Sequence, residues 1–196
     1  YCLDEADINL SQIEYVAINQ DSKANLWKKI RYTIGKRPDL NLILDRIQNK
    51  RKRKNLKNVL NDQFNKSFKG DIFEIEHHLA HLSSAFYVSP FEKAVVVSVD
   101  GFGDFASTAW GIGEGNEITV KKRVYFPHSL GIFYQSMTQW LGFPKYGDEY
   151  KVMGLAPYGK PIHLGKMRQI VKLKPDGSFD LGLNFFRFHK EKIEYK

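Results

Sequence analysis

Short apolar runs alternate along the chain with helical repeats of apolar residues, and this pattern predicts an α/β protein. Six segments have the alternation or the β-branched content of strands: 13–18, 71–76, 93–99, 105–112, 117–125 and 178–183. Helical spacing predicts helices over 2–10, 23–62 with a break at Pro38, 77–88, 129–141, 148–155 and 161–171. The order of these segments favours a fold with an antiparallel hairpin in its sheet.

Turn residues divide this pattern at two places. Residues 100–104 (DGFGD) follow the strongest predicted strand, 93–99, and are ordinary turn residues. Residues 113–116 (GEGN) separate strands 105–112 and 117–125, so we expect a hairpin there.

The composition fits one globular core and excludes several classes of protein. The chain has 196 residues, 42% hydrophobic and 27% charged, which excludes a disordered tail or a collagen-like chain. Its longest apolar run, residues 94–97, is far too short to span a bilayer, and no signal-peptide pattern is present. The single cysteine, Cys2, cannot form an internal disulfide. We therefore expect a cytoplasmic protein without a membrane span.

Positive charge is concentrated in one segment. Of the 30 Lys and Arg residues, 15 lie within residues 23–69 beside 3 acidic residues, so this segment carries +12 and the rest of the chain −4. The densest run, 50–54 (KRKRK), is typical either of nucleic-acid or anionic-membrane binding or of a solvated helical excursion. Aromatic residues for base stacking are few there, which favours the solvated helix over nucleic acid.

Three histidines stand at the start of the predicted helix 77–88. His77 and His81 are four residues apart and share one helix face, so both imidazoles can reach one metal ion. His78 points about 100° away and is not expected in the same site. Histidines that only satisfy hydrogen bonds are the alternative.

A carboxylate follows at the end of the next strand. Asp100 ends strand 93–99, where α/β sheets present ligand-binding residues, and a carboxylate can complete a histidine site for iron or zinc. Gly101 and Gly103 let backbone N–H groups approach a phosphate, and Thr108 on the next strand can add a hydroxyl. A tight hairpin turn without a ligand is the alternative.

Residues 126–131 (FPHSLG) and 147–159 (GDEYKVMGLAPYG) form a third group. The second segment places two acids, a lysine and two tyrosines around a short helix bounded by glycines. The start of such a helix binds anions, and Lys151 can neutralise one. A structural helix pair with a polar edge explains the same residues equally well.

Three motifs, taken in order, resemble one known family. They are EHHLAHLSSAFYVSPFEKAVVVSVDGFGD (76–104), FPHSLGIFYQSMTQWLGF (126–143) and GDEYKVMGLAPYGKP (147–161). Together they resemble the O-carbamoyltransferases of the nodulation-protein and antibiotic-tailoring type, and several motifs in order are far more specific than any one of them. Residues 1–18 resemble the family's first helix and strand more weakly.

The resemblance implies both a fold and an activity. The fold would be a partial actin-like ATPase (ribonuclease-H-like) fold with a mixed sheet, incomplete in this chain because its first strand lies upstream. Members of the family make carbamoyl-adenylate from carbamoyl phosphate and ATP in a C-terminal adenylate-forming domain, which this chain lacks. They then pass the carbamoyl group to a hydroxyl of a small-molecule acceptor. We therefore expect a fragment of such an enzyme, inactive on its own.

The resemblance also implies a division of the chain. Residues 1–22 would start the transferase domain, 23–69 would be a basic, helical, variable insertion, and 70–196 would bind metal and nucleotide.

Roles follow for individual residues. The metal, iron or a substitute such as zinc or manganese, would be held by His77, His81 and Asp100. The residues expected to contact ATP or carbamoyl-adenylate are Gly101, Gly103, Asp104, Thr108 and Lys151. The candidates for the base that takes the proton of the acceptor hydroxyl are His128 and Asp148.

Two other functions are compatible with the same residues. One is a related transferase that carbamoylates or threonylcarbamoylates tRNA or protein, whose basic segment would bind RNA with a steep salt dependence. The other is a non-catalytic domain stabilised by its metal.

Overall fold

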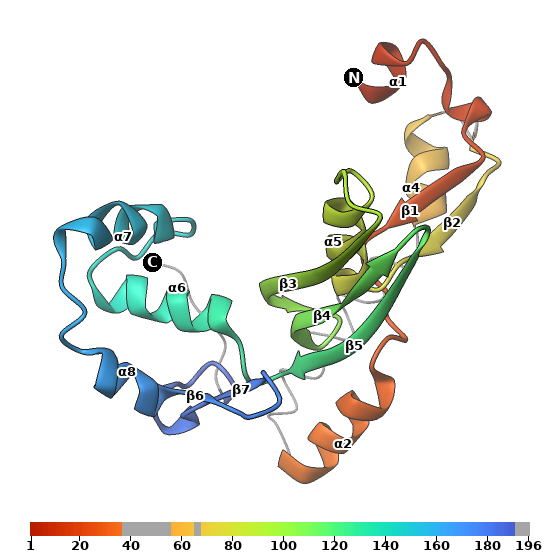
Figure 1. The fold of residues 1–196 in the computed structure, drawn as a ribbon. Helices are drawn as coiled ribbons and strands as arrows, with labels where there is room; N and C mark the ends of the chain where they lie inside the picture. Colours follow the sequence, from red (N-terminus) through yellow and green to blue (C-terminus); the bar gives the residue numbers. More distant parts are fainter. Residues whose placement is uncertain (37–55, 65–67, 191–196) are drawn as a thin grey trace.

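The computed structural model of the chain describes residues 1–36, 56–64 and 68–190, and it is an α/β structure as predicted (Figure 1). Parallel and antiparallel pairing both occur, but in separate sheets among the described strands. These sheets are the parallel pair β1 (Tyr15–Ile18) and β2 (Asp71–Glu74), the antiparallel sheet β3 (Lys93–Gly103), β4 (Ala106–Glu114) and β5 (Glu117–Tyr125), and the antiparallel pair β6 (Val171–Leu173) and β7 (Phe179–Leu181). The predicted break at Pro38 and the basic run 50–54 lie outside the described residues.

The hairpin of β3 and β4 is longer than predicted. The expected strand ends at Val99 and is followed by a turn over 100–104, whereas β3 continues to Gly103, which pairs with Ala106. The ladder is irregular between Val99 and Gly103, so the predicted turn is mostly a bulged stretch of strand. A bulge lets the backbone leave regular pairing and re-aim side chains without ending the strand.

The second hairpin, between β4 and β5, also has a shorter loop than the predicted 113–116. Glu114 pairs with Glu117, which leaves a two-residue connection that includes Gly115. Gly115 has a φ of 56°, a left-handed conformation that glycine adopts without steric cost.

The hydrophobic core lies between this sheet and the helix α5 (His77–Phe86), which ends two residues before the predicted 88. Leu82 and Phe86 of α5 pack against Val96 of β3 and Ala109 of β4. Alternate residues of a strand point to opposite faces, so the neighbours of Val96 turn away from the helix.

The opposite face of β3 is apolar and exposed. Val95, Val97 and Val99 are 73%, 59% and 54% exposed. Within the described strands β3 pairs only with β4, so it is also an edge of its sheet.

The N-terminal segment departs from the predicted helix 2–10. The helix α1 (Cys2–Glu5) is short, and the 3-10 helix η1 (Leu10–Gln12) follows it. Asp7 between them has a φ of 51°, which is incompatible with a continuing right-handed helix. Two described parts of the predicted helical stretch 23–62 are helical, namely α2 (Leu26–Lys36) and α4 (Leu56–Gln63).

The C-terminal part consists mainly of helices. The predicted helices 129–141 and 148–155 are confirmed as α6 (Leu130–Trp140) and α7 (Glu149–Leu155). The predicted helix 161–171 begins only at α8 (Leu164–Ile170), and its last residue starts strand β6 instead. The predicted strand 178–183 contains the shorter β7, and the remaining elements are the 3-10 helices η2 (Ala156–Tyr158) and η3 (Leu183–Phe185).

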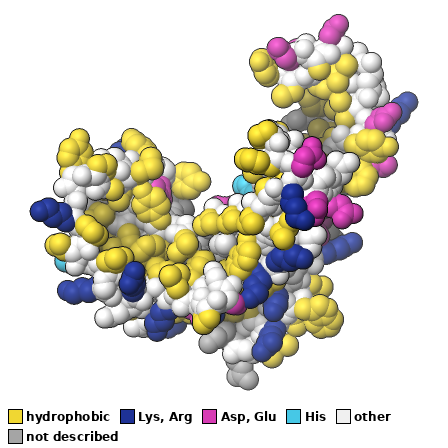
Figure 2. All heavy atoms as spheres, viewed as in Figure 1, with side chains coloured by type: hydrophobic (Ala, Val, Ile, Leu, Met, Phe, Trp, Pro, Cys, Tyr) yellow, Lys and Arg dark blue, Asp and Glu magenta, His cyan; other side chains and the backbone are white. Residues whose placement is uncertain are grey.

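In Figure 1 the sheet β3-β4-β5 lies between a lobe of α6, α7 and α8 on one side and the elements α1, β1, β2 and α4 on the other. Hydrophobic side chains are exposed over the α6–α8 lobe, whereas Lys and Arg gather over β5 and α2 (Figure 2). None of the helices in the described part of the chain has the length and apolar character needed to cross a bilayer.

Candidate metal centre

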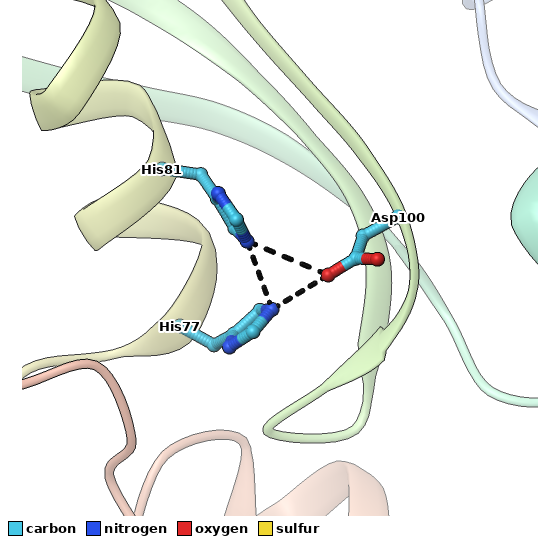
Figure 3. A group of neighbouring side chains, drawn as sticks. All are labelled: His77, His81 and Asp100. Atoms are coloured by element: carbon cyan, nitrogen blue, oxygen red, sulfur yellow. Dashed lines mark hydrogen bonds and ion pairs between the residues drawn. The ribbon is translucent and has the colours of Figure 1, made fainter. Parts of the chain in front are cut away.

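Two imidazoles and one carboxylate converge at the junction of α5 and β3 (Figure 3). His77 Nε2 lies 2.7 Å from Asp100 Oδ2 and 3.1 Å from His81 Nε2. His81 Nε2 lies 3.4 Å from the same carboxylate oxygen, so the three ligand atoms form a small triangle. The helical spacing of the histidines and the position of Asp100 in the irregular stretch of β3 therefore bring together the three residues of the predicted cluster, although the strand itself does not end at Asp100 as predicted.

The size of this triangle fits a bound cation. Metal–ligand distances of about 2.1 Å place neighbouring ligand atoms about 3.0 Å apart in an octahedral site and about 3.4 Å apart in a tetrahedral one. The three observed separations, 2.7, 3.1 and 3.4 Å, lie close to this range. Imidazole nitrogen and carboxylate oxygen together suit iron, zinc or manganese.

A backbone carbonyl faces the other ring nitrogen of His77. His77 Nδ1 lies 3.3 Å from the Asn19 carbonyl oxygen, which accepts the hydrogen bond when the ring proton is on Nδ1. In that tautomer the Nε2 lone pair points at Asp100 and His81, as metal binding requires, whereas without a metal Nε2 can instead carry the proton and donate it to Asp100. Three lone pairs aimed at one another repel unless a proton or a cation lies between them, and a single cation satisfies all three.

Gly103 makes the close approach of α5 to β3 possible. A Cβ atom at this residue would overlap the His77 ring, so the imidazole packs flat on the glycine backbone. Gly101 is different, because the nearest atom to a Cβ there is Ile132 Cδ1 at 3.8 Å. Gly101 therefore has room for a Cβ atom, whereas Gly103 is covered by a histidine.

Asp100 stays ionised in this setting. Burial alone would raise the pKa of its carboxyl, but the hydrogen bonds from His77 and from the Gly101 N–H, with the adjacent His77 and His81 rings, lower the pKa below its usual value. The Gly101 N–H donates to Asp100 Oδ1 at 2.6 Å, which leaves Oδ2 facing the histidines. The helix α6 secures the strand from the other side, because the hydroxyl of its N-cap Ser129 donates to the Asp100 carbonyl oxygen at 3.0 Å.

The N-terminus of α5 is held by a carboxylate that sequence reasoning missed. Glu76 Oε2 accepts hydrogen bonds from the Leu79 N–H at 2.8 Å and from Arg123 at 3.1 Å. Burial raises the pKa of Glu76, but Arg123 and the helix N–H groups together lower it by more, so its pKa lies below the usual value. Its place directly before His77 was the available signal, although Glu is not a preferred N-cap residue.

His78 is confirmed to lie outside the cluster. It is fully buried, and its Nδ1 is 2.9 Å from the Ser98 hydroxyl on β3. Burial is the largest influence on its pKa and lowers it, so the ring is neutral near pH 7. It fills the core that supports the two histidines of the cluster.

The two candidate bases have other partners. His128 Nδ1 accepts a hydrogen bond from the Leu181 N–H at 3.0 Å, and its Nε2 faces Asp180 at 3.4 Å. Asp148 is buried and forms an ion pair with Lys151 at 2.6 Å, which holds the pKa of its carboxyl low. These contacts belong to the β7 and α7 regions, and the catalytic roles stay predictions.

Of the remaining nucleotide candidates, Thr108 is buried in β4, and its hydroxyl oxygen has no hydrogen-bond partner among the described residues. Asp104 lies in the turn between β3 and β4, and its carboxylate accepts two backbone hydrogen bonds. The structure brings the predicted metal ligands together. Lys151, in contrast, lies in α7 and forms an ion pair with Asp148.

Fold and site together define an α/β protein with a two-histidine, one-aspartate centre between a helix and a strand end. The family model for the carbamoyltransferase N-terminus matches residues 1–195. The chain therefore belongs to the carbamoyltransferase family, which confirms the resemblance seen in its motifs.

Individual relatives agree with this membership. The chain is 34% identical over 198 residues to an uncharacterized protein from Synechocystis sp., covering 96% of this chain and 32% of that protein. It is 34% identical over 188 residues to nodulation protein NolNO of Sinorhizobium fredii, covering 94% and 26%. It is 41% identical over 113 residues to nodulation protein NolO of Bradyrhizobium diazoefficiens, covering 56% and 20%. The chain thus spans less than a third of the length of each of these relatives.

Proposed function

We propose that the full-length protein transfers a carbamoyl group to a hydroxyl of a small-molecule acceptor, with carbamoyl-adenylate made from carbamoyl phosphate and ATP as the donor. Membership of the carbamoyltransferase family supports transfer of this kind. The convergence of His77, His81 and Asp100 is the observation in this chain that carries the proposal, because it offers a site for a divalent metal between α5 and β3.

In this proposal the three residues hold a divalent ion, iron or a substitute such as zinc or manganese. When bound, such an ion polarises a carbonyl or phosphate oxygen and lowers the cost of negative charge there. The chain's own contribution is geometric. The Asn19 carbonyl orients the His77 ring, and the Gly101 N–H fixes one oxygen of Asp100, so the other oxygen and both Nε2 atoms face one point.

The nucleotide is proposed to lie along the end of β3, as in a partial actin-like ATPase fold. The hydroxyl of Thr108, which has no hydrogen-bond partner among the described residues, supports a phosphate or ribose contact there, whereas the Gly101 N–H would have to leave Asp100 Oδ1 to bind a phosphate. Gly103 and Asp104 support it less directly, because one is covered by His77 and the other engages backbone N–H groups. Lys151 would have to leave Asp148 to reach a phosphate.

His128 and Asp148 stay the candidates for the base that accepts the hydroxyl proton. Each would have to give up a contact first: His128 the N–H of Leu181, and Asp148 the ammonium of Lys151. A carboxylate beside an ammonium is a weak base, and the lone pair of a hydrogen-bonded imidazole is not free to accept a proton.

Removing single ligands tests the metal centre in the full-length protein. We expect His77→Ala and His81→Ala to lose stoichiometric metal and to abolish carbamoyl transfer with little loss of melting temperature. The exposed His163 is the matched control, and His163→Ala is expected to retain both metal and activity. Equal metal content in all four proteins would disprove the assignment. Residues 1–196 alone are expected to be inactive, since they span less than a third of the length of these relatives.

The same proteins distinguish the two alternatives. In a non-catalytic metal-stabilised domain, the histidine variants would lower the melting temperature sharply and leave turnover in the full-length protein unchanged. In a transferase acting on RNA, binding of a tRNA acceptor would weaken steeply with salt.

A further inference from the structure

The turn between β3 and β4 consists of two residues in an unusual backbone conformation. Asp104 and Phe105 have φ angles of 47° and 74°. A two-residue hairpin of this type needs positive φ at both positions, which Asp tolerates and Phe adopts rarely. Such a turn persists when contacts on either side of it fix the chain, and Asp104 makes those contacts.

Asp104 connects three segments that are far apart in sequence. Its Oδ2 accepts hydrogen bonds from the backbone N–H of His77 at 2.9 Å and of Asp21 at 2.8 Å. Its carbonyl oxygen accepts a third, from the Asn25 side-chain amide at 2.9 Å. One residue therefore holds the first residue of α5 and the loop that follows β1.

Both bonds to Oδ2 bear on the same imidazole. The N–H of His77 fixes the backbone from which the ring projects. The N–H of Asp21 fixes the loop that contains Asn19, whose carbonyl faces His77 Nδ1 at 3.3 Å. Asp100 lies on β3, four residues before Asp104, which directly follows the last residue of that strand. The end of β3 thus carries one metal ligand and the anchor for another.

We propose that Asp104 is a positioning residue of the metal centre: its carboxylate fixes the place and the orientation of the His77 imidazole relative to Asp100. This inference rests on the proposed function insofar as the centre binds a metal. Removing a residue that hydrogen-bonds a metal ligand typically weakens metal binding by about 10–100-fold.

Two substitutions separate the carboxylate from the turn conformation. Asp104→Gly keeps a residue that favours positive φ but removes the hydrogen-bond acceptor. Asp104→Asn keeps a side-chain oxygen at the same distance from the backbone and also tolerates positive φ. A purely conformational role for Asp104 predicts that both variants behave alike, whereas positioning predicts that only Asp104→Gly is impaired.

The test is titration of the metal-free full-length protein with Co²⁺, followed by visible absorption and calorimetry. We expect Asp104→Gly to bind Co²⁺ about 10–100-fold more weakly than wild type with an altered spectrum, and Asp104→Asn to restore affinity to within about threefold. The matched control is Asp176→Gly, which removes a carboxylate that accepts the Ser178 N–H in the β6–β7 turn, and it should leave Co²⁺ binding unchanged. Wild-type affinity and spectrum in Asp104→Gly would overturn the proposal while the metal centre stands.

Amide hydrogen exchange gives a readout that needs no metal. The His77 N–H is expected to exchange faster in Asp104→Gly than in wild type and Asp104→Asn, and unchanged protection would also overturn the proposal. Failure of the wild-type protein to bind Co²⁺ would instead remove the proposed metal centre, and this inference with it. If Asp104→Gly does not fold, Asp104→Ser, whose shorter side chain withdraws the acceptor, takes its place in both measurements.

Discussion

Gly131, the second residue of α6, lies against the backbone of Asp100: a Cβ atom at residue 131 would come within 2.7 Å of the Asp100 carbonyl oxygen. Helix and strand end meet here without an intervening side chain. The position of the Asp100 carboxylate therefore depends on a glycine that lies in another element.

Gly131→Ala is expected to destabilise the protein although alanine favours helices. Helix propensity favours alanine by about 1 kcal/mol, but overlap with a strand backbone costs roughly 1–3 kcal/mol, because neither element can move freely. Gly154→Ala in α7 is the matched control, since no atom lies within 4 Å of a Cβ there. Urea unfolding should show a loss for Gly131→Ala and a gain of up to about 1 kcal/mol for Gly154→Ala. A gain in both would contradict the close packing.

Gly103→Ala and Gly101→Ala are expected to differ in metal binding. A methyl group at Gly103 overlaps the His77 ring and forces it to shift, whereas one at Gly101 meets only Ile132 at 3.8 Å. Zn²⁺ affinity measured by calorimetry should fall more than about tenfold in Gly103→Ala. Gly101→Ala should bind Zn²⁺ as wild type does. Equal affinity in both variants would show that the ring does not depend on this contact.

Arg123→Met is expected to lower the free energy of unfolding by roughly 1–3 kcal/mol, because it leaves the partly buried carboxylate of Glu76 without its cation. The same substitution in an exposed pair is the control. Lys93 and Glu114 lie 2.8 Å apart with side chains 61% and 64% exposed, so Lys93→Met should cost less than about 1 kcal/mol. Chemical denaturation of both variants measures the difference, and similar losses would argue against a special role of Arg123.

The stability of the protein is expected to decrease as the pH falls below about 6.5, through His128. Burial lowers the pKa of this imidazole below 6.5, although Asp180 opposes the shift, while Lys174 and His189 add to it. The unfolded chain then binds the proton more readily, so the contribution is complete above pH 6.5 and is lost as the pH falls through the folded-state pKa.

His128→Asn should remove this component, because its amide oxygen can accept the Leu181 N–H without titrating. Urea unfolding of wild type and variant at several pH values tests the expectation. Parallel stability curves across this range would show that His128 does not cause the dependence.

The sequence predicted the metal cluster because its signals are local. Helical spacing fixes the angle between His77 and His81, and a β-branched run ending in Asp100 fixes the strand end. The partners of these residues come from distant segments. Asn19 reaches the site from the loop after β1 and Arg123 from β5, and neither belongs to a motif that periodicity reveals.

The predicted element boundaries were wrong where the local conformational preference of the residues competes with pairing between strands. Residues 100–103 have turn composition, yet pairing of Gly103 with Ala106 extends β3 through a bulge. Val171 continues a helical pattern but joins β6, because Leu181 offers it a partner. In both places a strand contact formed across the chain outweighs the tendency of the residues themselves.

The exposed valines of β3 have a consequence for handling the polypeptide. Val95, Val97 and Val99 present an apolar strip on a strand that pairs on only one side among the described residues, and such strips recruit strands from other molecules. Purified in isolation, residues 1–196 should therefore aggregate as concentration rises. The substitution Val97→Lys should improve solubility without disturbing the core, because the side chain at residue 97 points away from α5.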